Sequence, residues 1–225
     1  MKKGNLFLVI FGLILLTGMY ATNHTLANEY QNIDLTDRYK NYVSIPSEAY
    51  SVLAISGSNG YPIEIAHAQT DAIKVLRSRV DHFKSNLIND TLFIEFTGSN
   101  IPMEQRFHSD TPSGIIIEKN TLSSILNINT HQRISGFSNQ DLTLILEGNA
   151  FIEVSNCDVH TLDIDMKHRS QIGFSHKNTV DSLHIKMVNT SIARLQEIEF
   201  RAIQHTLSDS ITVVLSKGVF NRVLE

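Results

Sequence analysis

The chain has 225 residues, 42% of them hydrophobic, which is enough for one sizeable core after a leader is set aside. Its 19 lysines and arginines and 23 aspartates and glutamates give a net charge of −4, which does not support nucleic-acid binding. Its one cysteine, Cys157, excludes an internal disulfide framework, and a half-buried structural thiol is expected there.

The N-terminal segment 1–27 has the pattern of a membrane-targeting sequence. Lys2 and Lys3 precede an apolar run from Leu6 to Ala21, and no Asp, Glu, Lys or Arg lies between Lys3 and Glu29. A short basic start followed by an apolar stretch is typical of a cleaved signal peptide or of a signal anchor that stays in the membrane. Residues 1–27 are therefore expected to carry the rest of the chain out of the cytoplasm.

A retained anchor fits this segment better than a cleaved peptide. Cleavage needs small residues directly before the cut, which Met19 and Ala21 match poorly, and Thr25 with Ala27 lie well past the apolar run. The positive charges at the start place the N-terminus in the cytoplasm. We therefore expect a protein of the periplasm or cell envelope, held by a single N-terminal transmembrane helix.

Residues 28–49 are predicted to be a polar tether, because they show no sustained apolar period. Strand patterns begin at residue 50, and residues 50–225 are predicted to form one domain. Five strand-like segments bounded by turn residues precede residue 120. They are Val52–Ile55, Ile63–Ile65, Ile73–Val75, Leu92–Phe96 and Ile115–Ile117.

From Leu142 onward the sequence repeats with a 20–21-residue period, and each copy holds two short alternating strands. Apolar residues occupy the same offsets in each copy, which turns one face of both strands inward. The expected inner columns are Leu142, Leu162, Leu183 and Ile203, and Leu146, Met166, Met187 and Leu207. A unit this short must stack on its neighbours to bury its apolar face.

The predicted fold is therefore all-β, a parallel β-helix with 20–21-residue rungs that follows an N-terminal hydrophobic helix. Residues 50–140 are expected to continue this structure with irregular early rungs, because no linker-like stretch separates the two halves. An antiparallel β-sandwich is the alternative, since its strands also recur at short intervals. A sandwich, however, gives no reason for the offsets to recur at a constant registry.

The strand patterns from Leu53-Ala-Ile-Ser-Gly57 to the repeated Leu-x-Ile-x-Met units resemble the bacterial auto-transporter adhesin "head GIN domain" family. The resemblance covers roughly residues 50 to 223. It implies a right-handed parallel β-helix and an adhesin-like envelope protein, and it supplies no catalytic residues. The family's small turn residues occur here at Gly148 to Ala150 but are replaced in the next two copies.

Two outward carboxylates, Asp163 and Asp165, are the nearest candidates for an enzymatic site, because β-helix polysaccharide lyases and hydrolases use acidic or Ca²⁺-binding side chains on one outer face. The next copy places His184 level with Asp163 and Lys186 level with Asp165. Opposite charges on adjacent strands are a usual way to stabilise a solvent-facing sheet, so the structural interpretation is favoured and no catalytic residue is predicted.

No metal or other cofactor is predicted. The ten histidines occur singly, without the spacing that brings three or four ligands together. His205 occupies an inner offset, and a partly exposed, hydrogen-bonded side chain is expected there because the core is ending.

A modest basic cluster in the early part of the domain is a possible ligand-contact surface for an acidic glycan or envelope polymer. Its members are Lys74, Arg77, Arg79 and Lys84. A solvated strand edge is the favoured interpretation of this cluster, and ligand contact is the alternative. The function favoured by the sequence is a non-enzymatic cell-envelope protein for adhesion, scaffolding or glycan binding, with the envelope glycan or another protein as partner. The alternative is a carbohydrate-active β-helix enzyme.

Overall fold

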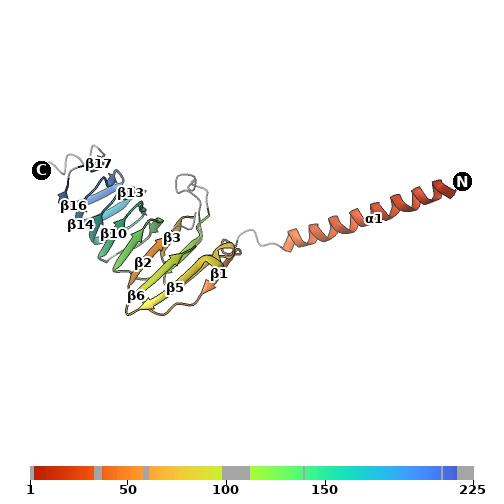
Figure 1. Ribbon diagram of the computed structural model, residues 1–225, viewed down its shortest axis with the longest axis horizontal. Helices are drawn as coiled ribbons and strands as arrows, with labels where there is room; N and C mark the ends of the chain where they lie inside the picture. Colours follow the sequence, from red (N-terminus) through yellow and green to blue (C-terminus); the bar gives the residue numbers. More distant parts are fainter. Residues whose placement is uncertain are drawn as a thin grey trace. The chain divides into compact units, whose positions relative to one another are not determined.

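A computed structural model describes residues 3–32, 37–57, 61–97, 112–138, 140–208 and 210–216. The chain divides into two compact units, Met1–Lys40 and Asn41–Glu225. The first unit contains one α-helix, and the second is built from strands (Figure 1). The predicted all-β class with an N-terminal apolar helix is confirmed.

The helix α1 (Lys3–Asn32) has 30 residues and extends past the predicted end of the leader at residue 27. At about 1.5 Å per residue it is about 45 Å long, which exceeds the hydrocarbon thickness of a membrane. Its segment Val9–Gln31 has a mean hydropathy of 1.3 and is 0% buried. By length and composition this helix can cross a membrane, as a signal sequence also can.

The second unit contains strands and one short 3-10 helix over its described residues. The strands are β1 (Tyr42–Ile45), β2 (Val52–Gly57), β3 (Ile63–His67), β4 (Ala72–Leu76), β5 (Phe83–Ile88), β6 (Thr91–Phe96), β7 (Ile115–Lys119), β8 (Ser124–Ile128), β9 (His131–Ser135), β10 (Leu142–Glu147), β11 (Phe151–Ser155), β12 (Asp158–Met166), β13 (Gln171–Ser175), β14 (Asn178–Met187), β15 (Ile192–Leu195), β16 (Ile198–Leu207) and β17 (Thr212–Leu215). The 3-10 helix is η1 (Arg77–His82).

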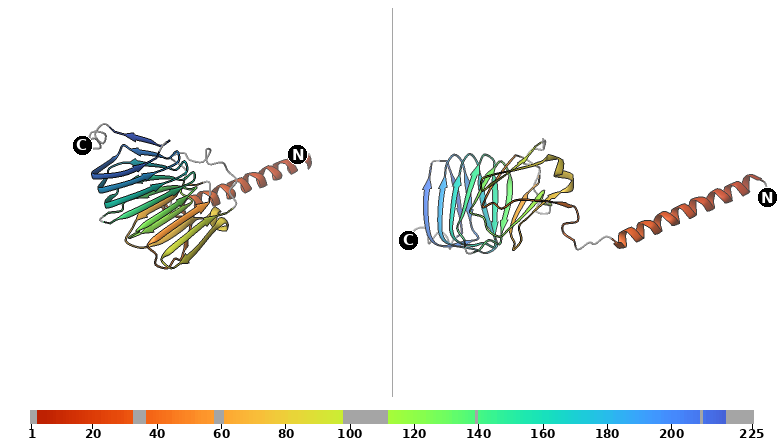
Figure 2. Two further views of the ribbon diagram at one scale, coloured as in Figure 1. Left: turned by 60° about the vertical axis from the view of Figure 1, so that its left-hand side comes forward. Right: turned by 90° about the horizontal axis from the view of Figure 1, so that it is seen from below.

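These strands form two large sheets. The nine-stranded sheet has the order β1-β4-β7-β3-β9-β11-β13-β15-β17, and the eight-stranded sheet has the order β16-β14-β12-β10-β8-β2-β6-β5. From β8 onward, consecutive strands belong alternately to the two sheets. Figure 2 shows the resulting stack, in which the chain passes from one sheet to the other and back.

Parallel pairing in the C-terminal half follows the period of the sequence. In the eight-stranded sheet Leu142 pairs with Leu162, Leu162 with Leu183 and Leu183 with Ile203. These are the residues that begin successive copies of the sequence pattern, so neighbouring strands are displaced by one period along the chain. Each copy therefore meets the next copy at equivalent positions.

The expectation that residues 50–140 continue this structure with irregular early rungs does not hold for two strands, because they pair antiparallel. β4 pairs antiparallel with β1 and β7, and β5 pairs antiparallel with β6. Only Asn89 and Asp90 separate β5 from β6, and a parallel crossover needs a dozen or more residues. Asn89 has φ 55°, which suits the tight reversal of a hairpin.

The segment 28–49, predicted to be a polar tether, includes the end of α1 and all of β1. β1 is an edge strand whose Tyr42 and Ile45 pair with Leu76 and Ile73 of β4. Ile45 also packs against the hydrophobic core. The C-terminal part of this segment is therefore held to the sheet.

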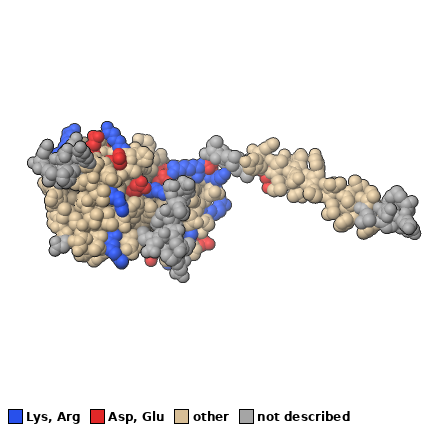
Figure 3. Space-filling view, turned by 90° about the horizontal axis from the view of Figure 1, so that it is seen from above, with Lys and Arg blue, Asp and Glu red and all other residues tan. Residues whose placement is uncertain are grey.

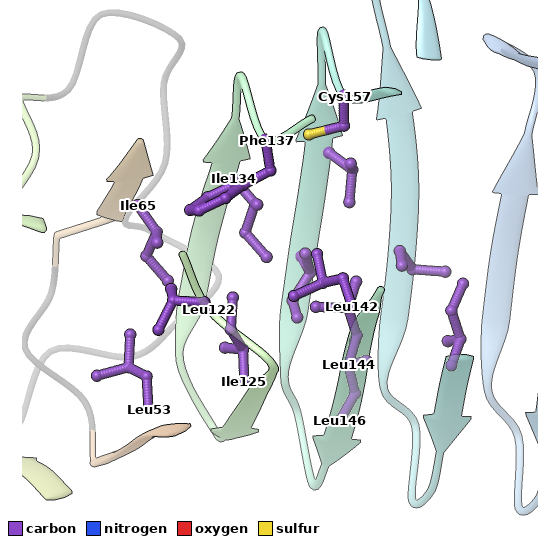
Figure 4. Packing of buried hydrophobic residues seen from close by; sticks show 14 of the residues in the cluster. Leu53, Ile65, Leu122, Ile125, Ile134, Phe137, Leu142, Leu144, Leu146 and Cys157 are labelled. Atoms are coloured by element: carbon purple, nitrogen blue, oxygen red, sulfur yellow. The ribbon is translucent and has the colours of Figure 1, made fainter. Parts of the chain in front are cut away.

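The core lies between the two sheets and is lined, from β10 to β15, by alternate side chains of each strand. Leu142, Leu144 and Leu146 of β10 are each at most 1% exposed and point to the same interior (Figure 4). The predicted burial of Met166 and Ile185 is confirmed, with exposed fractions of 0% and 4%. Both expected inner columns are buried from β10 to β14.

Burial declines in the last copy. Ile203 is partly buried, Leu207 is 42% exposed, and His205 is exposed. These residues belong to β16, which lies at one end of the eight-stranded sheet and is paired with β14 on one side. Among the described residues no strand pairs with the free side of β16, and apolar side chains at such a free side stay in contact with water.

Asn178 connects three successive turns of the chain at a buried corner. Its amide nitrogen lies 3.4 Å from the carbonyl oxygen of Val154 and 3.0 Å from that of Glu197. Its amide oxygen accepts a hydrogen bond of 3.1 Å from the backbone N–H of Cys157. The Asn178 amide thus satisfies backbone groups that would otherwise be buried without partners.

Cys157 is 4% exposed, more buried than expected, and this burial raises the pKa of its thiol.

The assignment of inward and outward faces can be tested by exchanging one residue of each kind. Ile185→Asp places an unpaired carboxylate in the core and is expected to lower the free energy of unfolding by about 3–5 kcal/mol. Asp163→Asn, on a side chain that is 48% exposed, is expected to cost less than about 1 kcal/mol. Urea denaturation of residues 28–225, followed by circular dichroism, measures both. Equal losses would contradict the assignment.

His131 makes stability depend on pH. It is 9% exposed, its ring packs edge-on against Phe151 at 4.6 Å, and burial lowers its pKa from 6.5 to about 4. As the pH falls, the unfolded chain is protonated at this site before the folded chain is. The stability at this site is therefore complete above pH 6.5 and falls between pH 6.5 and 4, by about 1.4 kcal/mol per pH unit.

We therefore expect His131→Gln, which cannot take up the proton, to lose less stability between pH 7 and pH 5 than the natural chain. The difference is expected to be about 2 kcal/mol, because pH 5 lies about 1.5 units below the unfolded pKa. Urea denaturation at the two pH values measures it. An identical pH dependence in both proteins would show that His131 is protonated equally in the folded and unfolded states.

Candidate functional site

The candidate site lies on the outer face of the eight-stranded sheet, over β10, β12, β14 and β16. Side chains that alternate with the core residues point outward here, because successive side chains of a strand point to opposite faces. The parallel register aligns them in two rows across the strands. One row is Thr143, Asp163, His184 and Gln204, and the other is Ile145, Asp165, Lys186 and Thr206.

The first row is joined by a charge-assisted contact. Asp163 Oδ1 lies 2.7 Å from His184 Nδ1, and both side chains are nearly half exposed. The predicted neighbours Asp163 with His184 and Asp165 with Lys186 are level with each other in the register of β12 and β14. The contact holds the carboxylate in place on the strand surface.

The second row continues into another ion pair. Asp165 Oδ2 lies 3.9 Å from Lys167 Nζ, which is 3.1 Å from Glu147 Oε1. The hydrogen bond with Glu147 and the charge of Asp165 raise the pKa of the Lys167 ammonium group. Asp165 Oδ1 is buried and has no hydrogen-bond partner among the described residues.

A third contact of the same kind lies farther along the strands. Asp181 Oδ2 is 3.3 Å from His160 Nδ1, and Asp181 Oδ1 is 3.3 Å from Arg201 Nε. The outer face of this half thus carries both signs of charge in compensated pairs. Figure 3 shows basic and acidic residues interspersed over one side of the body.

The two rows line a shallow, open depression of about 420 Å³. Its lining mixes carboxylates, an imidazole, an ammonium group, an amide and hydroxyls, contributed by Asp163, Asp165, His184, Lys186, Gln204 and Thr206. Parallel strands repeat about every 4.8 Å, so donors and acceptors recur at that interval along each row. Such a surface can hydrogen-bond a ligand that carries many hydroxyl groups.

The structure disperses the predicted basic cluster over three elements and gives two of its members carboxylate neighbours. Lys74 on β4 forms an ion pair with Glu118 on β7, and Lys84 on β5 lies opposite Glu95 on β6. Arg77 and Arg79 belong to η1, and the Arg79 guanidinium stacks over the Tyr61 ring at 4.4 Å. The role of these four residues in ligand contact stays a prediction.

Among the described residues, no three His, Cys, Asp or Glu side chains converge as ligands for a metal ion. His108 lies outside the described residues. The sequence analysis missed Gln204, Thr206 and Lys167 as parts of the polar surface. Their offsets in the repeat, equal to those of Asp163, Asp165 and Glu147 in other copies, could have identified them.

No family model and no curated protein matches this chain. Among solved structures, a "putative adhesin" from Bacteroides fragilis has 9% identity and a TM-score of 0.42, over 78% of this chain and 96% of that one. A "putative adhesin" from Parabacteroides distasonis has 13% identity and a TM-score of 0.36, over 78% and 96%. A "putative lipid binding protein" from the same species has 13% identity and a TM-score of 0.29, over 77% and 96%. Likenesses this distant do not carry a function over to this chain.

Proposed function

We propose that this chain is a non-enzymatic protein of the cell envelope that binds a polyhydroxylated ligand, such as an envelope glycan, on the polar outer face of β12, β14 and β16. The observation that carries the proposal is the pair of rows in which hydrogen-bond donors and acceptors lie side by side on neighbouring strands. A glycan presents hydroxyl groups along its length, and a flat row of donors and acceptors can meet several of them together.

The proposal includes the architecture of the body. Residues 50–225 form a right-handed parallel β-helix with 20–21-residue rungs from β8 onward, to which the antiparallel strands β4 and β5 are added at the N-terminal end, as in the head GIN domain family that the sequence resembles. The pairing of Leu142 with Leu162 and of Leu162 with Leu183 supports the rung length, and the alternation of strands between two sheets supports the winding. A β-helix repeats its outer side chains at each rung and thereby makes the polar rows possible.

Residues 1–27 are proposed to be a retained anchor and residues 28–49 the connection to the body. The support is the length and apolar character of α1, which suffice for one membrane span. Lys2 and Lys3, which precede the apolar run, favour a cytoplasmic N-terminus, so the body faces outward.

The anchor is tested by fractionation of cells that produce the full chain. The protein is expected in the membrane pellet at its full mass of 25.3 kDa, and it should resist carbonate extraction because a spanning helix is held by apolar contact with lipid. Residues 28–225 should be soluble and folded. A mature N-terminus at Asn28 in intact cells would refute the retained anchor.

The ligand is tested on a glycan array with the full-length chain in detergent micelles. We expect binding to envelope-type polysaccharides, and a loss of about tenfold or more in affinity for a double variant, Asp163→Asn with His184→Gln. A matched control is Glu153→Gln, which removes a carboxylate 4.0 Å from Arg133 on the other sheet and should bind normally. Equal binding by both variants would reject this surface as the site.

Incubation of the chain with the polysaccharide that it binds, followed by measurement of the polysaccharide length, tests the enzymatic alternative. A carbohydrate-active enzyme would shorten the bound polysaccharide, with or without Ca²⁺, and would lose that activity in a folded Asp163→Asn, Asp165→Asn double variant. Degradation with this loss would overturn the non-enzymatic proposal. Binding without degradation supports it.

A further inference from the structure

The end strand β5 of the eight-stranded sheet has a side on which no other strand lies. Among the described residues, β5 pairs with β6 alone, and we call the side that faces away from β6 the free side of β5. At the same end of the body, β1 is the end strand of the other sheet (Figure 1). In the described part of the chain, both sheets therefore end here without a covering strand.

The backbone groups of alternate residues of β5 point toward its free side. β5 and β6 form a hairpin with a two-residue turn, so the residues that flank the turn, Ile88 and Thr91, exchange hydrogen bonds. Hydrogen-bonded pairs then alternate with pairs that are not bonded. The residues of β5 whose N–H and C=O groups point away from β6 are therefore Phe83, Ser85 and Leu87.

Hydrogen bonds at the start of β5 agree with this alternation. The carbonyl oxygen of His82 accepts a hydrogen bond of 3.0 Å from the N–H of Thr97, the residue directly after β6. The N–H of the next residue, Phe83, points the other way and donates to the carbonyl oxygen of Val80 in η1. Within the described ranges, the N–H and C=O groups of Ser85 have no hydrogen-bond partner.

A groove lies along β5 at this end of the body. Its volume is about 800 Å³, and its walls come from β1, η1, β5 and β6. Ile45, Val80 and Phe83 form its apolar part and are only partly buried against the core. Ser85 occupies an inward position, level with the buried Ile94, and is nevertheless exposed. The end of the core is therefore incompletely covered beside the free side of β5.

The hydrogen-bonding groups and the groove together specify an extended peptide. An added strand supplies backbone donors and acceptors at the spacing of those that β5 presents, as in peptide recognition by strand addition. Its side chains alternate, so every second one would enter the apolar part of the groove and the others would meet Lys84 and Asn86 at its polar border. A lipid chain could fill the apolar part, but it offers no donor or acceptor to the strand.

β5 also lacks two features that commonly prevent strand addition. Edge strands are often protected by a proline or by a charged side chain that points inward. β5 contains no proline, and its one charged residue, Lys84, lies between the inward positions. The strand is six residues long, which is a usual length for a paired strand.

We propose that the free side of β5 and the groove along it bind an extended segment of another protein, which becomes a ninth strand of the eight-stranded sheet. The backbone of this segment pairs with Ser85 and Leu87, and its alternate apolar side chains pack against Ile45, Val80 and Phe83. Four strands, β6, β2, β8 and β10, separate β5 from the polar rows over β12, β14 and β16. The proposal therefore does not depend on glycan binding.

The length of β5 predicts a weak, reversible contact. A segment that pairs with six residues forms an interface well below the standard size of about 1,600 Å². Ordering such a segment also costs conformational entropy. We therefore expect dissociation constants of the order of micromolar for single peptides.

The site is tested with a phage-displayed library of random heptapeptides, selected on the full-length chain in detergent micelles. Selected peptides are synthesised with a fluorescent label, and their affinity is measured by fluorescence anisotropy. Ser85→Pro removes an N–H from the free side of β5, whereas the pairing with β6 does not use this N–H. We expect this variant to bind the peptides at least about tenfold more weakly than the natural chain.

A matched control places proline on the free side of the strand at the other end of the same sheet. The N–H of Ser208 donates to Met187 on β14 at 3.0 Å, so by alternation the N–H of residue 205 points away from β14. His205→Pro should therefore leave peptide affinity within about twofold of the natural value. Urea denaturation checks that each variant is folded.

A second measurement alters the peptide instead of the protein. One set of alternate peptide amides faces β5 in the added strand, and the other set faces water. N-methylation of the first set should weaken binding by at least about tenfold, and N-methylation of the second set should not.

Four outcomes would overturn the proposal. They are the absence of any selected peptide, equal binding to the natural chain and a folded Ser85→Pro variant, equal effects of the two N-methylated sets, and a dimer of the chain, detected by sedimentation, that Ser85→Pro disrupts. The last outcome would show that a second copy, and not a segment of another protein, occupies the free side of β5.

Discussion

The stacking of inward apolar side chains at equivalent positions of successive copies is the constraint on which the rest of the body depends. A strand that slipped by one residue would expose Ile164 and bury Asp163, because side chains alternate between faces. The cost of burying that carboxylate is several kcal/mol, far more than a single surface contact supplies. Buried corners add to the specificity, since the Asn178 amide matches backbone groups of the turns before and after it.

The same registry organises the outer surface. Because every outward position meets an equivalent position on the next strand, side chains of one kind can form rows across several strands. In the eight-stranded sheet this gives the polar rows from Asp163 to Thr206. One sheet can thereby hold chemically distinct surfaces without a change of fold.

The two ends of the stack differ physically. At the N-terminal end, β1 pairs antiparallel with β4 and β5 pairs antiparallel with β6. These two end strands place Ile45, Phe83 and Leu87 against the core. At the C-terminal end, β16 keeps the parallel register but leaves Leu207 42% exposed. An antiparallel strand can be added to the end of a sheet after a short turn. A parallel strand can be added only after a longer connection, which here is a further copy of the repeat. Stability is therefore expected to be highest between β8 and β14, where each strand has neighbours on both sides.

The sequence by itself determined the all-β class, the apolar helix, the burial of Met166 and Ile185 and the level placement of Asp163 with His184, because these depend on alternation and on a period that recurs locally along the chain. It did not determine the antiparallel pairing of β4 with β1 and β7 or the position of β2 between β6 and β8. Those depend on pairing between distant segments, which no local pattern encodes. That order brings Phe93 of β6, Ala54 of β2 and Leu126 of β8 to adjacent positions of one sheet, although they lie far apart in the chain.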